Sequence, residues 1–198
     1  IHNAIENYWF KTHNNFTNKP HIIFLGRIGE DPFTLKLKGV DRLIWLFKQF
    51  PEIKKISIVM FRNKKLISWL KNNIPNLLIV NNAVKNTIPV LLKSYAGGIT
   101  LLTSRYEGFS LSLIEAMSQN LVPVAFPVGV APEIICNGKN GFIVHSIEEA
   151  KEKINFLLKN KNARQRMAVA AKKTAKQFKS DMMIEKMFNL YNKILKKS

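Results

Sequence analysis

The sequence is poor in cysteine, in acidic residues and in long apolar runs. Its 198 residues include one cysteine, Cys136, which excludes a disulfide framework and is typical of a reducing compartment. No apolar run approaches the roughly 18 to 20 residues that a membrane-spanning helix needs. No set of Cys, His, Asp and Glu residues has the spacing of a zinc site. These absences argue against disulfide-rich scaffolds, membrane-spanning helices and zinc-binding folds.

The shortage of acidic residues leaves a strongly basic chain. Lysine and arginine number 31 against 13 aspartates and glutamates, which gives a net charge of +18. Such a surface attracts phosphates, whether in nucleic acid, in anionic lipid or in a small phosphorylated ligand. The chain is also rich in asparagine and isoleucine, a bias that genomic base composition produces without selection for binding. The charge alone therefore leaves both interpretations open.

Short apolar runs alternate with segments of helical period, and 46% of all residues are hydrophobic. Runs this short and this apolar are typical of strands that are buried on both faces. The alternation predicts an α/β fold, a Rossmann-like doubly wound parallel sheet of about six strands with helices on both faces and ligands at the carboxyl ends of the strands. The apolar runs are 21–25, 56–60, 77–80, 99–102, 122–126 and 142–144, and the helical segments between them are 40–50, 64–72, 87–96 and 111–119.

The two ends of the chain differ from this pattern. After Val144 the pattern is helical, with a capping box formed by Ser146 and Glu149. The last helix, within residues 180–198, has an apolar stripe that we expect to pack on this domain or on a missing neighbour. Residues 1–20 lack regularity and begin with isoleucine, so we expect a linker cut from a longer protein, followed by one domain over 21–198.

The segment 104–116, S-R-Y-E-G-F-S-L-S-L-I-E-A, carries the most chemistry. A helix is expected to open near Ser110, and the free amides and positive dipole end of a first helical turn form an anion site. The amides of Phe109, Ser110 and Leu111 are therefore candidate phosphate ligands. Gly108 allows a sharp turn and a close backbone approach to the ligand.

Two carboxylates flank this anion site. Glu107 precedes the helix and Glu115 lies within it, and carboxylates accept hydrogen bonds well from paired hydroxyls such as those of a ribose or another sugar. The alternative is that Glu115 is a solvated helix residue and Glu107 an acid that favours the helix dipole. Arg27 and Lys38 follow the first strand and are candidate phosphate-binding cations. Together these residues describe a pocket for a sugar joined to a diphosphate.

The motifs at these positions resemble those of retaining glycosyltransferases. The similarity is to the donor-binding, C-terminal half of family 4 enzymes of the GT-B type, and it covers roughly residues 1 to 195. Its most specific element is the pair Glu107 and Glu115, eight residues apart. The matching motifs are His2-Asn3-Ala4-Ile5, Gly26-Arg27, Lys38-Gly39-Val40-Asp41, Glu107-Gly108-Phe109, Glu115-Ala116-Met117, Pro123-Val124 and Asn137-Gly138-Lys139-Asn140-Gly141.

The resemblance implies a role for each candidate residue. Glu115 is expected to hold the nucleotide ribose, and Glu107 with the amides after Gly108 to hold the transferred sugar and the distal phosphate. Arg27 and Lys38 are expected to neutralise the departing diphosphate, with Gly26 beside them in the donor site. No D-x-D motif is present, so no metal and no cofactor is expected.

The resemblance also implies a whole-protein function. We expect a UDP- or GDP-linked sugar donor, retention of configuration at the sugar carbon and an N-terminal acceptor-binding domain in the same protein. The expected process is bacterial polysaccharide, lipopolysaccharide or glycolipid synthesis. The expected location is the cytoplasm, with a peripheral position on the inner face of the membrane as one option.

The sequence departs from the family pattern at three places. The gap between Arg27 and the lysines is long, so either Lys36 or Lys38 is the phosphate lysine. Family glycines after the second and third strands are replaced at 61–63 and 81–83, where larger residues are expected to narrow the base pocket. The family glycine after the E-A-M helix is Asn120, which tolerates the left-handed conformation of helix ends.

The alternative function is a basic module for anionic membrane or nucleic acid, without catalysis. Nucleic acid is the weaker choice, because aromatic and basic residues do not alternate on the strands and no helix-turn-helix is recognisable. A nicotinamide-binding sheet is excluded because no G-x-G-x-x-G motif follows the first strand. The lysines that crowd the helical tail are Lys151, Lys153, Lys159, Lys161, Lys172, Lys173, Lys176 and Lys179.

Overall fold

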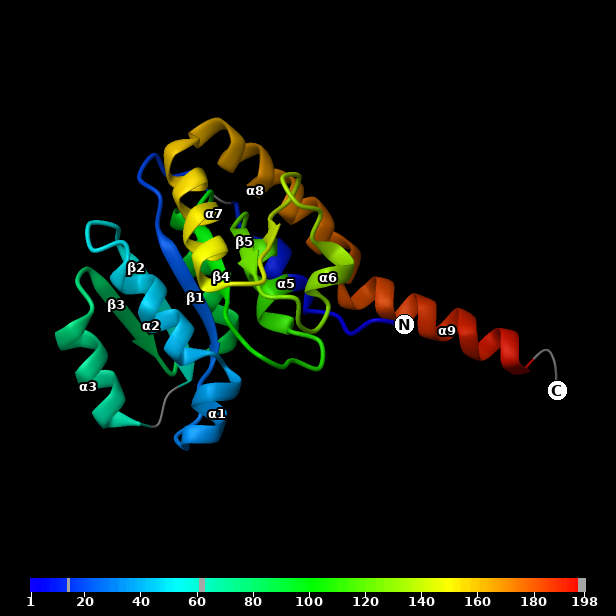
Figure 1. Ribbon diagram of the computed structural model, residues 1–198. Coiled ribbons are helices and arrows are strands. Elements are labelled where there is room, and N and C mark those ends of the chain that lie inside the picture. Colours follow the sequence, from blue (N-terminus) through cyan, green and yellow to red (C-terminus); the bar gives the residue numbers. More distant parts are fainter. Residues whose placement is uncertain (14, 61–62, 196–198) are drawn as a thin grey trace.

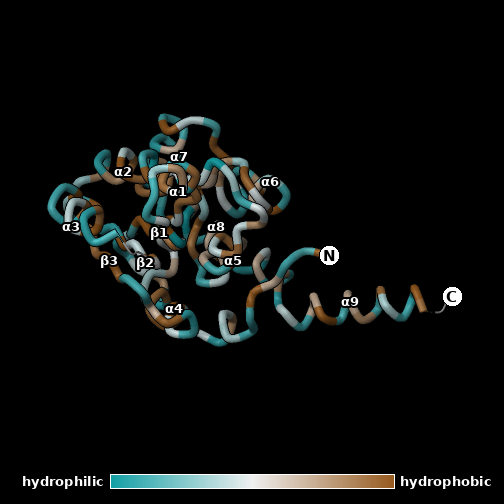
Figure 2. Tube along the Cα trace, turned by 90° about the horizontal axis from the view of Figure 1, so that it is seen from below, coloured by the Kyte–Doolittle hydropathy of each residue, from teal (hydrophilic) through white to brown (hydrophobic). Residues whose placement is uncertain are grey.

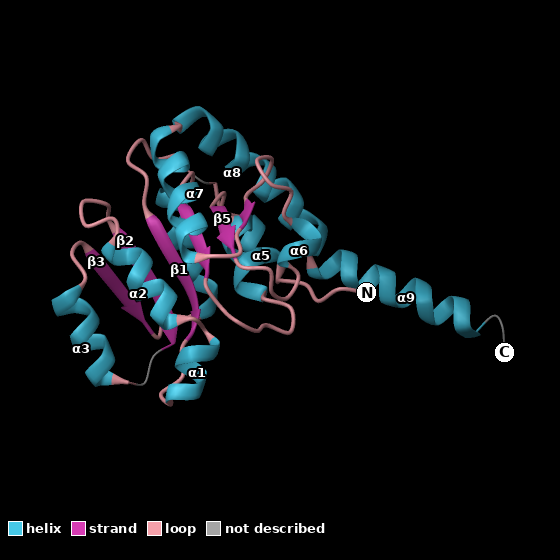
Figure 3. Cartoon of the chain, in the orientation of Figure 1, coloured by secondary structure: helices cyan, strands magenta, loops and turns pink. Residues whose placement is uncertain are grey.

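A computed structural model describes residues 1–13, 15–60 and 63–195. The described chain forms one parallel sheet in the order β3-β2-β1-β4-β5-β6, with helices on both faces (Figures 1 and 3). The doubly wound fold that the sequence predicts is therefore confirmed. The strands are β1 Ile22–Arg27, β2 Lys55–Met60, β3 Leu77–Asn81, β4 Ile99–Leu102, β5 Val122–Ala125 and β6 Phe142–Ile143.

The strand order reverses at β1. The chain builds β2 and β3 outward from one edge of β1, and then returns to place β4 on its other edge. The connections on the two sides therefore diverge at the carboxyl ends of β1 and β4. This divergence leaves a crevice between the two strands, which is where open α/β sheets bind their ligands.

The helices fall close to the predicted segments. The predictions for 40–50, 64–72 and 111–119 are confirmed within two residues at each end. Two short helices, α1 and α6, were not predicted, because four to six residues are too few to show a helical period. The helices are α1 Pro32–Leu37, α2 Val40–Lys48, α3 Lys64–Asn73, α4 Ile88–Leu92, α5 Leu111–Ser118, α6 Ala131–Ile134, α7 Ile147–Lys159, α8 Lys161–Ala175 and α9 Ser180–Leu195, with 3-10 turns at Asn7–Phe10 (η1), Lys85–Thr87 (η2), Lys93–Tyr95 (η3) and Lys176–Phe178 (η4).

The sheet separates two hydrophobic cores. In β1, Ile22 and Phe24 pack with α2, α3 and α7 on one face, while Ile23 and Leu25 pack with α4, α5 and the end of α8 on the other. Side chains alternate between the faces of a strand, so a strand buried on both sides must be apolar throughout. This burial explains the continuous apolar runs in the sequence.

The first ten residues pack against the domain. Ile5 and Trp9 are buried in the second core. The amide of Ile5 donates to the carbonyl of Phe178 at 2.9 Å, and the amide of Ser180 donates to the carbonyl of Ile5 at 3.0 Å. The interdomain role expected for residues 1–20 stays a prediction, but their first half contributes to the domain's own core.

Helix α9 extends away from the rest of the molecule (Figures 1 and 2). None of its described residues is buried. The apolar stripe expected from the sequence is exposed and includes Ile184, Phe188, Tyr191 and Leu195. Over the described residues, no helix combines the length and hydropathy that crossing a membrane requires.

Candidate functional site

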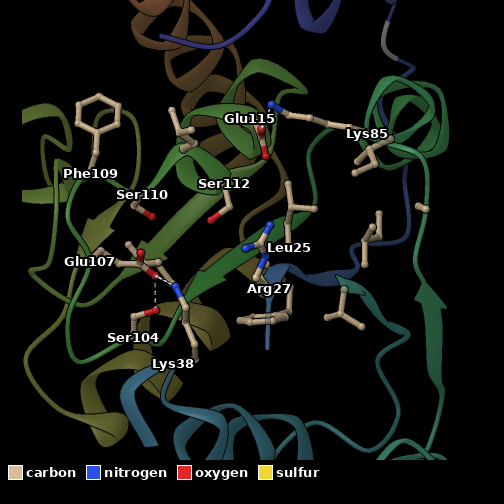
Figure 4. A pocket seen from close by; sticks show the side chains of 18 of the residues that line it. Leu25, Arg27, Lys38, Lys85, Ser104, Glu107, Phe109, Ser110, Ser112 and Glu115 are labelled. Atoms are coloured by element: carbon tan, nitrogen blue, oxygen red, sulfur yellow. Dashed lines mark hydrogen bonds and ion pairs between the residues drawn. The ribbon is translucent and has the colours of Figure 1, made fainter. Parts of the chain in front are cut away.

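A pocket of about 540 Å³ opens at the carboxyl ends of β1 and β4 (Figure 4). This volume is in the range of small-molecule sites, roughly 300 to 1,000 Å³. Eight of the nine predicted site residues line it, and Gly108 does not. The eight are Gly26, Arg27, Lys38, Glu107, Phe109, Ser110, Leu111 and Glu115; other lining residues include Asn3, Ala83, Lys85, Ser104 and Ser112.

The amino end of α5 forms one wall of the pocket. Its N-cap, Ser110, adopts a left-handed conformation with φ of 75°, and its side chain does not cap the helix. The Ser110 hydroxyl is buried without a hydrogen-bond partner among the described residues. The first amides of an α-helix also lack intrahelical acceptors. This end of the pocket therefore presents unpaired donors and a positive dipole end to a ligand.

The residues with left-handed backbone around the turn before α5 are not the one that the sequence suggested. Gly108 was expected to supply the sharp turn, but its φ is not in the left-handed region and a Cβ there would touch nothing. The positive φ belongs to Ser110 and to Gly129, which packs behind the loop. A Cβ on Gly129 would lie 2.7 Å from the carbonyl oxygen of Phe109. Gly108 therefore needs no special backbone conformation here, and its close approach to a ligand stays a prediction.

The loop that carries Glu107 is fastened to the start of α2. Gly39 has a φ of 62°, and a Cβ on it would lie 1.9 Å from the carbonyl oxygen of Thr103. The guanidinium of Arg105 donates to both carboxylate oxygens of Asp41 at 2.7 and 2.6 Å. Such a bidentate ion pair fixes the relative orientation of the two side chains as well as attracting them to each other. These contacts hold the loop after β4 against the loop after β1.

Glu107 is held by two donors on one of its oxygens. Its Oε1 accepts from the hydroxyl of Ser104 at 2.7 Å and from the ammonium of Lys38 at 2.8 Å (Figure 4). Lys36 is exposed and does not line the pocket, although its carbonyl accepts from Arg105. Of the two lysines that the sequence left open, Lys38 is the one that faces the pocket.

Arg27 supplies a cation at the end of β1. Its side chain is exposed and points into the pocket (Figure 4). Among the residues that the structure describes, no carboxylate lies within ion-pair distance of it. The guanidinium is therefore available to an anion that enters beside the amino end of α5.

Glu115 lies deeper in the same pocket. Its residue surface is 8% exposed, so the interpretation of a solvated helix residue is wrong. Burial raises the pKa of its carboxyl from 4.5 to about 7. The positive charge of Lys85 opposes this rise, and the negative charge of Glu6 adds to it. The Nζ of Lys85 is 3.9 Å from the Glu115 Oε1. Lys85 was not predicted as a site residue, because a lone lysine in a lysine-rich chain carries no local signal.

The family glycines replaced in this sequence have physical explanations at two positions. Asn82 and Asn120 have φ values of 55° and 57°, a region that asparagine tolerates better than most residues. The prediction for Asn120 is thus confirmed, and its amide also donates to the carbonyl of Ala168 at 3.1 Å. Of the replaced stretch 61–63, residues 61 and 62 lie outside the described chain.

The pocket combines three kinds of surface. Cations and a helix amino end suit an anion, two carboxylates suit hydroxyl groups, and an apolar wall suits a flat or hydrophobic group. In the described ranges, no group of three or more His, Cys, Asp and Glu side chains could hold a metal ion. The apolar wall consists of Phe24, Leu25, Ile58, Val59, Ile88 and Leu102.

Comparisons with known proteins identify glycosyl transferases as relatives of this chain. A model of the family described as "Glycosyl transferases group 1" matches residues 6–174. A poly(glycerol-phosphate) alpha-glucosyltransferase of Bacillus subtilis is 26% identical over 166 residues, which cover 76% of this chain and 24% of that protein. The chain thus spans about a quarter of the length of this relative.

Two solved structures share the fold. Sucrose-phosphate synthase from Thermosynechococcus elongatus superposes with a TM-score of 0.77 at 18% identity, over 91% of this chain and 47% of that one. The C-terminal domain of a glycosyl transferase group 1 family protein from Francisella tularensis superposes with a TM-score of 0.64 at 24% identity, over 80% of this chain and 87% of that one.

Proposed function

Because the chain belongs to the group 1 glycosyl transferases, we propose that its pocket binds a nucleotide-diphosphate sugar and that the chain is the donor-binding half of a retaining enzyme. One observation carries the proposal. The amino end of α5, Arg27, Lys38 and two carboxylates converge on a single pocket at the strand-order reversal. A ligand that satisfies all of them has a pyrophosphate between two groups that carry hydroxyls.

The pyrophosphate is assigned to the amino end of α5. The buried Ser110 hydroxyl and the free amides of the first turn donate to its oxygens, and Arg27 binds it from the β1 side. During transfer the bond between the sugar carbon and the phosphate oxygen breaks, and negative charge develops on the departing diphosphate. Donors and cations that are already in place stabilise that charge without a metal ion.

The two carboxylates are assigned to the two sugars of the donor. Glu115, deep in the pocket, accepts from the ribose hydroxyls of the nucleotide. Glu107 lies nearer to Lys38 and Ser104, which hold one of its oxygens and leave the other for a hydroxyl of the transferred sugar. Lys38, which pairs with Glu107 on this side of the pocket, is assigned to the distal phosphate.

The rest of the enzyme is proposed from the length of the relatives. The chain covers 24% of the glucosyltransferase and 47% of the synthase, so an N-terminal acceptor-binding domain in the same protein accounts for the remainder. The exposed apolar stripe of α9 is assigned to contact with that domain. The name of the glucosyltransferase supports a poly(glycerol-phosphate) chain as the class of acceptor. The net charge of +18 supports action at an anionic membrane surface.

Calorimetric titration of the chain with UDP and with GDP tests the proposal. We expect one of them to bind weakly, and we expect Glu115→Gln to weaken that binding tenfold or more, since a hydrogen bond to a charged group contributes about 1.5 to 3 kcal/mol. Glu148→Gln, an exposed acid on α7, is the matched control and should bind like the parent. The absence of any heat of binding with either nucleotide, in a folded sample, contradicts the proposal.

A further inference from the structure

A lysine outside the predicted site connects two carboxylates across the deep end of the pocket. Lys85 lies in the turn after β3, and its Nζ is 2.7 Å from the Oε1 of Glu6 and 3.9 Å from the Oε1 of Glu115. Figure 4 shows its side chain extending over the pocket toward Glu115. The three residues come from segments that are far apart in the sequence, and the fold brings their charged ends together.

Glu115 has few other sources of stabilisation. It is the buried member of the trio, whereas Glu6 and Lys85 are half exposed. In the described chain, Lys85 is the cation within ion-pair distance of its carboxylate. Glu6 and the Tyr8 hydroxyl face the same region from the amino-terminal segment, and Arg27 enters the pocket from β1. The charge state of Glu115 is therefore set by its burial and by a small number of identifiable groups.

We propose that Lys85 is a positioning residue of the donor site, whose ammonium favours the ionised form of the Glu115 carboxylate against the cost of its burial, while Glu6 competes with Glu115 for the same ammonium. The proposal rests on the assignment of Glu115 to the ribose. An ionised carboxylate accepts hydrogen bonds from two hydroxyls, whereas a protonated one must itself donate through one oxygen. Lys85 thus lowers the pH above which the deep end of the pocket accepts a nucleoside.

The amino-terminal segment takes part through Glu6. Ile5 and Trp9 are buried on either side of Glu6, so its backbone is anchored to the domain. The carboxylate of Glu6 draws the Lys85 ammonium to 2.7 Å and at the same time repels Glu115. Removal of either residue should therefore shift the pKa of Glu115 in a defined direction. Loss of Lys85 removes an attraction, and loss of Glu6 removes both a competitor and a repulsion.

The first test needs no ligand. The pKa of Glu115 is measured by carboxyl NMR in the parent chain, assigned by its disappearance in Glu115→Gln, and measured again in Lys85→Met and Glu6→Gln. We expect Lys85→Met to raise the pKa by roughly one pH unit or more, as removal of an opposite charge at this distance does. We expect Glu6→Gln to lower it. Both substituted side chains are half exposed, so the fold should tolerate them.

The second test is the pH profile of nucleotide binding. The affinity for the nucleoside diphosphate that binds the parent should rise through the pKa of Glu115, and this rise should move to higher pH in Lys85→Met and to lower pH in Glu6→Gln. Below the parent pKa, Lys85→Met should bind on the order of tenfold more weakly, which corresponds to one pH unit. Lys85→Arg, which keeps the charge, should restore the parent profile.

Shifts of the Glu115 pKa in opposite directions in Lys85→Met and Glu6→Gln support the proposal. An unchanged Glu115 pKa in Lys85→Met, or shifts of the same sign in both variants, overturns it, because a merely structural contact would affect both alike. If the parent binds no nucleoside diphosphate at any pH, the proposed function fails. The pKa measurements in the free protein still decide whether Lys85 controls Glu115.

Discussion

The Nζ of Lys38 and the Oε1 of Glu107 lie 2.8 Å apart, although 69 positions separate them in the sequence. The pair joins the loop after β1 to the loop after β4, on the two sides of the crevice where the strand order reverses. Both partners are half-buried, so water screens their attraction less than on an open surface. Lys38, which the sequence assigned to the departing diphosphate, is thus in direct contact with Glu107, which it assigned to the transferred sugar and the distal phosphate.

Lys38→Met should weaken binding of the nucleoside diphosphate by roughly tenfold to a hundredfold. The substitution removes a charge-assisted contact to the distal phosphate and leaves the Glu107 carboxylate without its cation. Lys36→Met is the matched control, because Lys36 is exposed and outside the pocket. Calorimetry on both variants decides between the two lysines, and a larger loss in Lys36→Met contradicts the placement.

Gly39→Ala should destabilise the domain by about 2 to 6 kcal/mol. The added Cβ combines a left-handed backbone with a clash against the carbonyl of Thr103, and the two costs are each about 1 to 3 kcal/mol. Gly108→Ala is the control, since a Cβ there meets open space at an ordinary φ. Urea unfolding of both variants measures the difference. Equal stability of the two would show that the close approach of Gly39 to Thr103 is not present in solution.

The stability of the parent chain should fall relative to Glu115→Gln as the pH rises from about 4.5 to 7. The folded state raises the pKa of Glu115 from 4.5 to about 7, so it binds a proton more tightly than the unfolded chain in this window. Each pH unit of difference corresponds to about 1.4 kcal/mol, and the full loss above pH 7 is about 3 kcal/mol. The glutamine does not titrate, so its urea unfolding curve at pH 4 and pH 8 provides the reference. A constant difference between the two proteins would mean that Glu115 is not buried as described.

The sheet was largely predictable because its signal is local. The central strands β1, β4 and β5 are buried on both faces, so their residues had to be apolar; the edge strands β3 and β6 are only partly buried, but all six strands coincide with the six apolar runs. Helix α2 likewise shows its buried stripe, with Val40, Leu43 and Phe47 at helical spacing. Helices α1 and α6 were missed because a helix of four to six residues has no period to recognise.

The site was predictable only in part, for a related reason. Residues at strand ends, such as Arg27 and Glu107, could be placed by topology, because the carboxyl ends of parallel strands share one edge of the sheet. Contacts between segments that lie far apart in the sequence could not be placed in this way. The pairing of Lys85 with Glu6 and Glu115 depends on how the first ten residues pack, and the left-handed Ser110 depends on the approach of Gly129 from behind the loop. Neither has a signature within its own stretch of sequence.

The central claim is that a pyrophosphate binds at the amino end of α5, and amide NMR tests it most directly. On addition of UDP or GDP, the backbone amide signals of Ser110, Leu111 and Ser112 should shift the most, and Arg27→Met should reduce those shifts. If the amide shifts instead cluster on α7 and α8, where the surface lysines crowd, or if none occurs, the claim is contradicted.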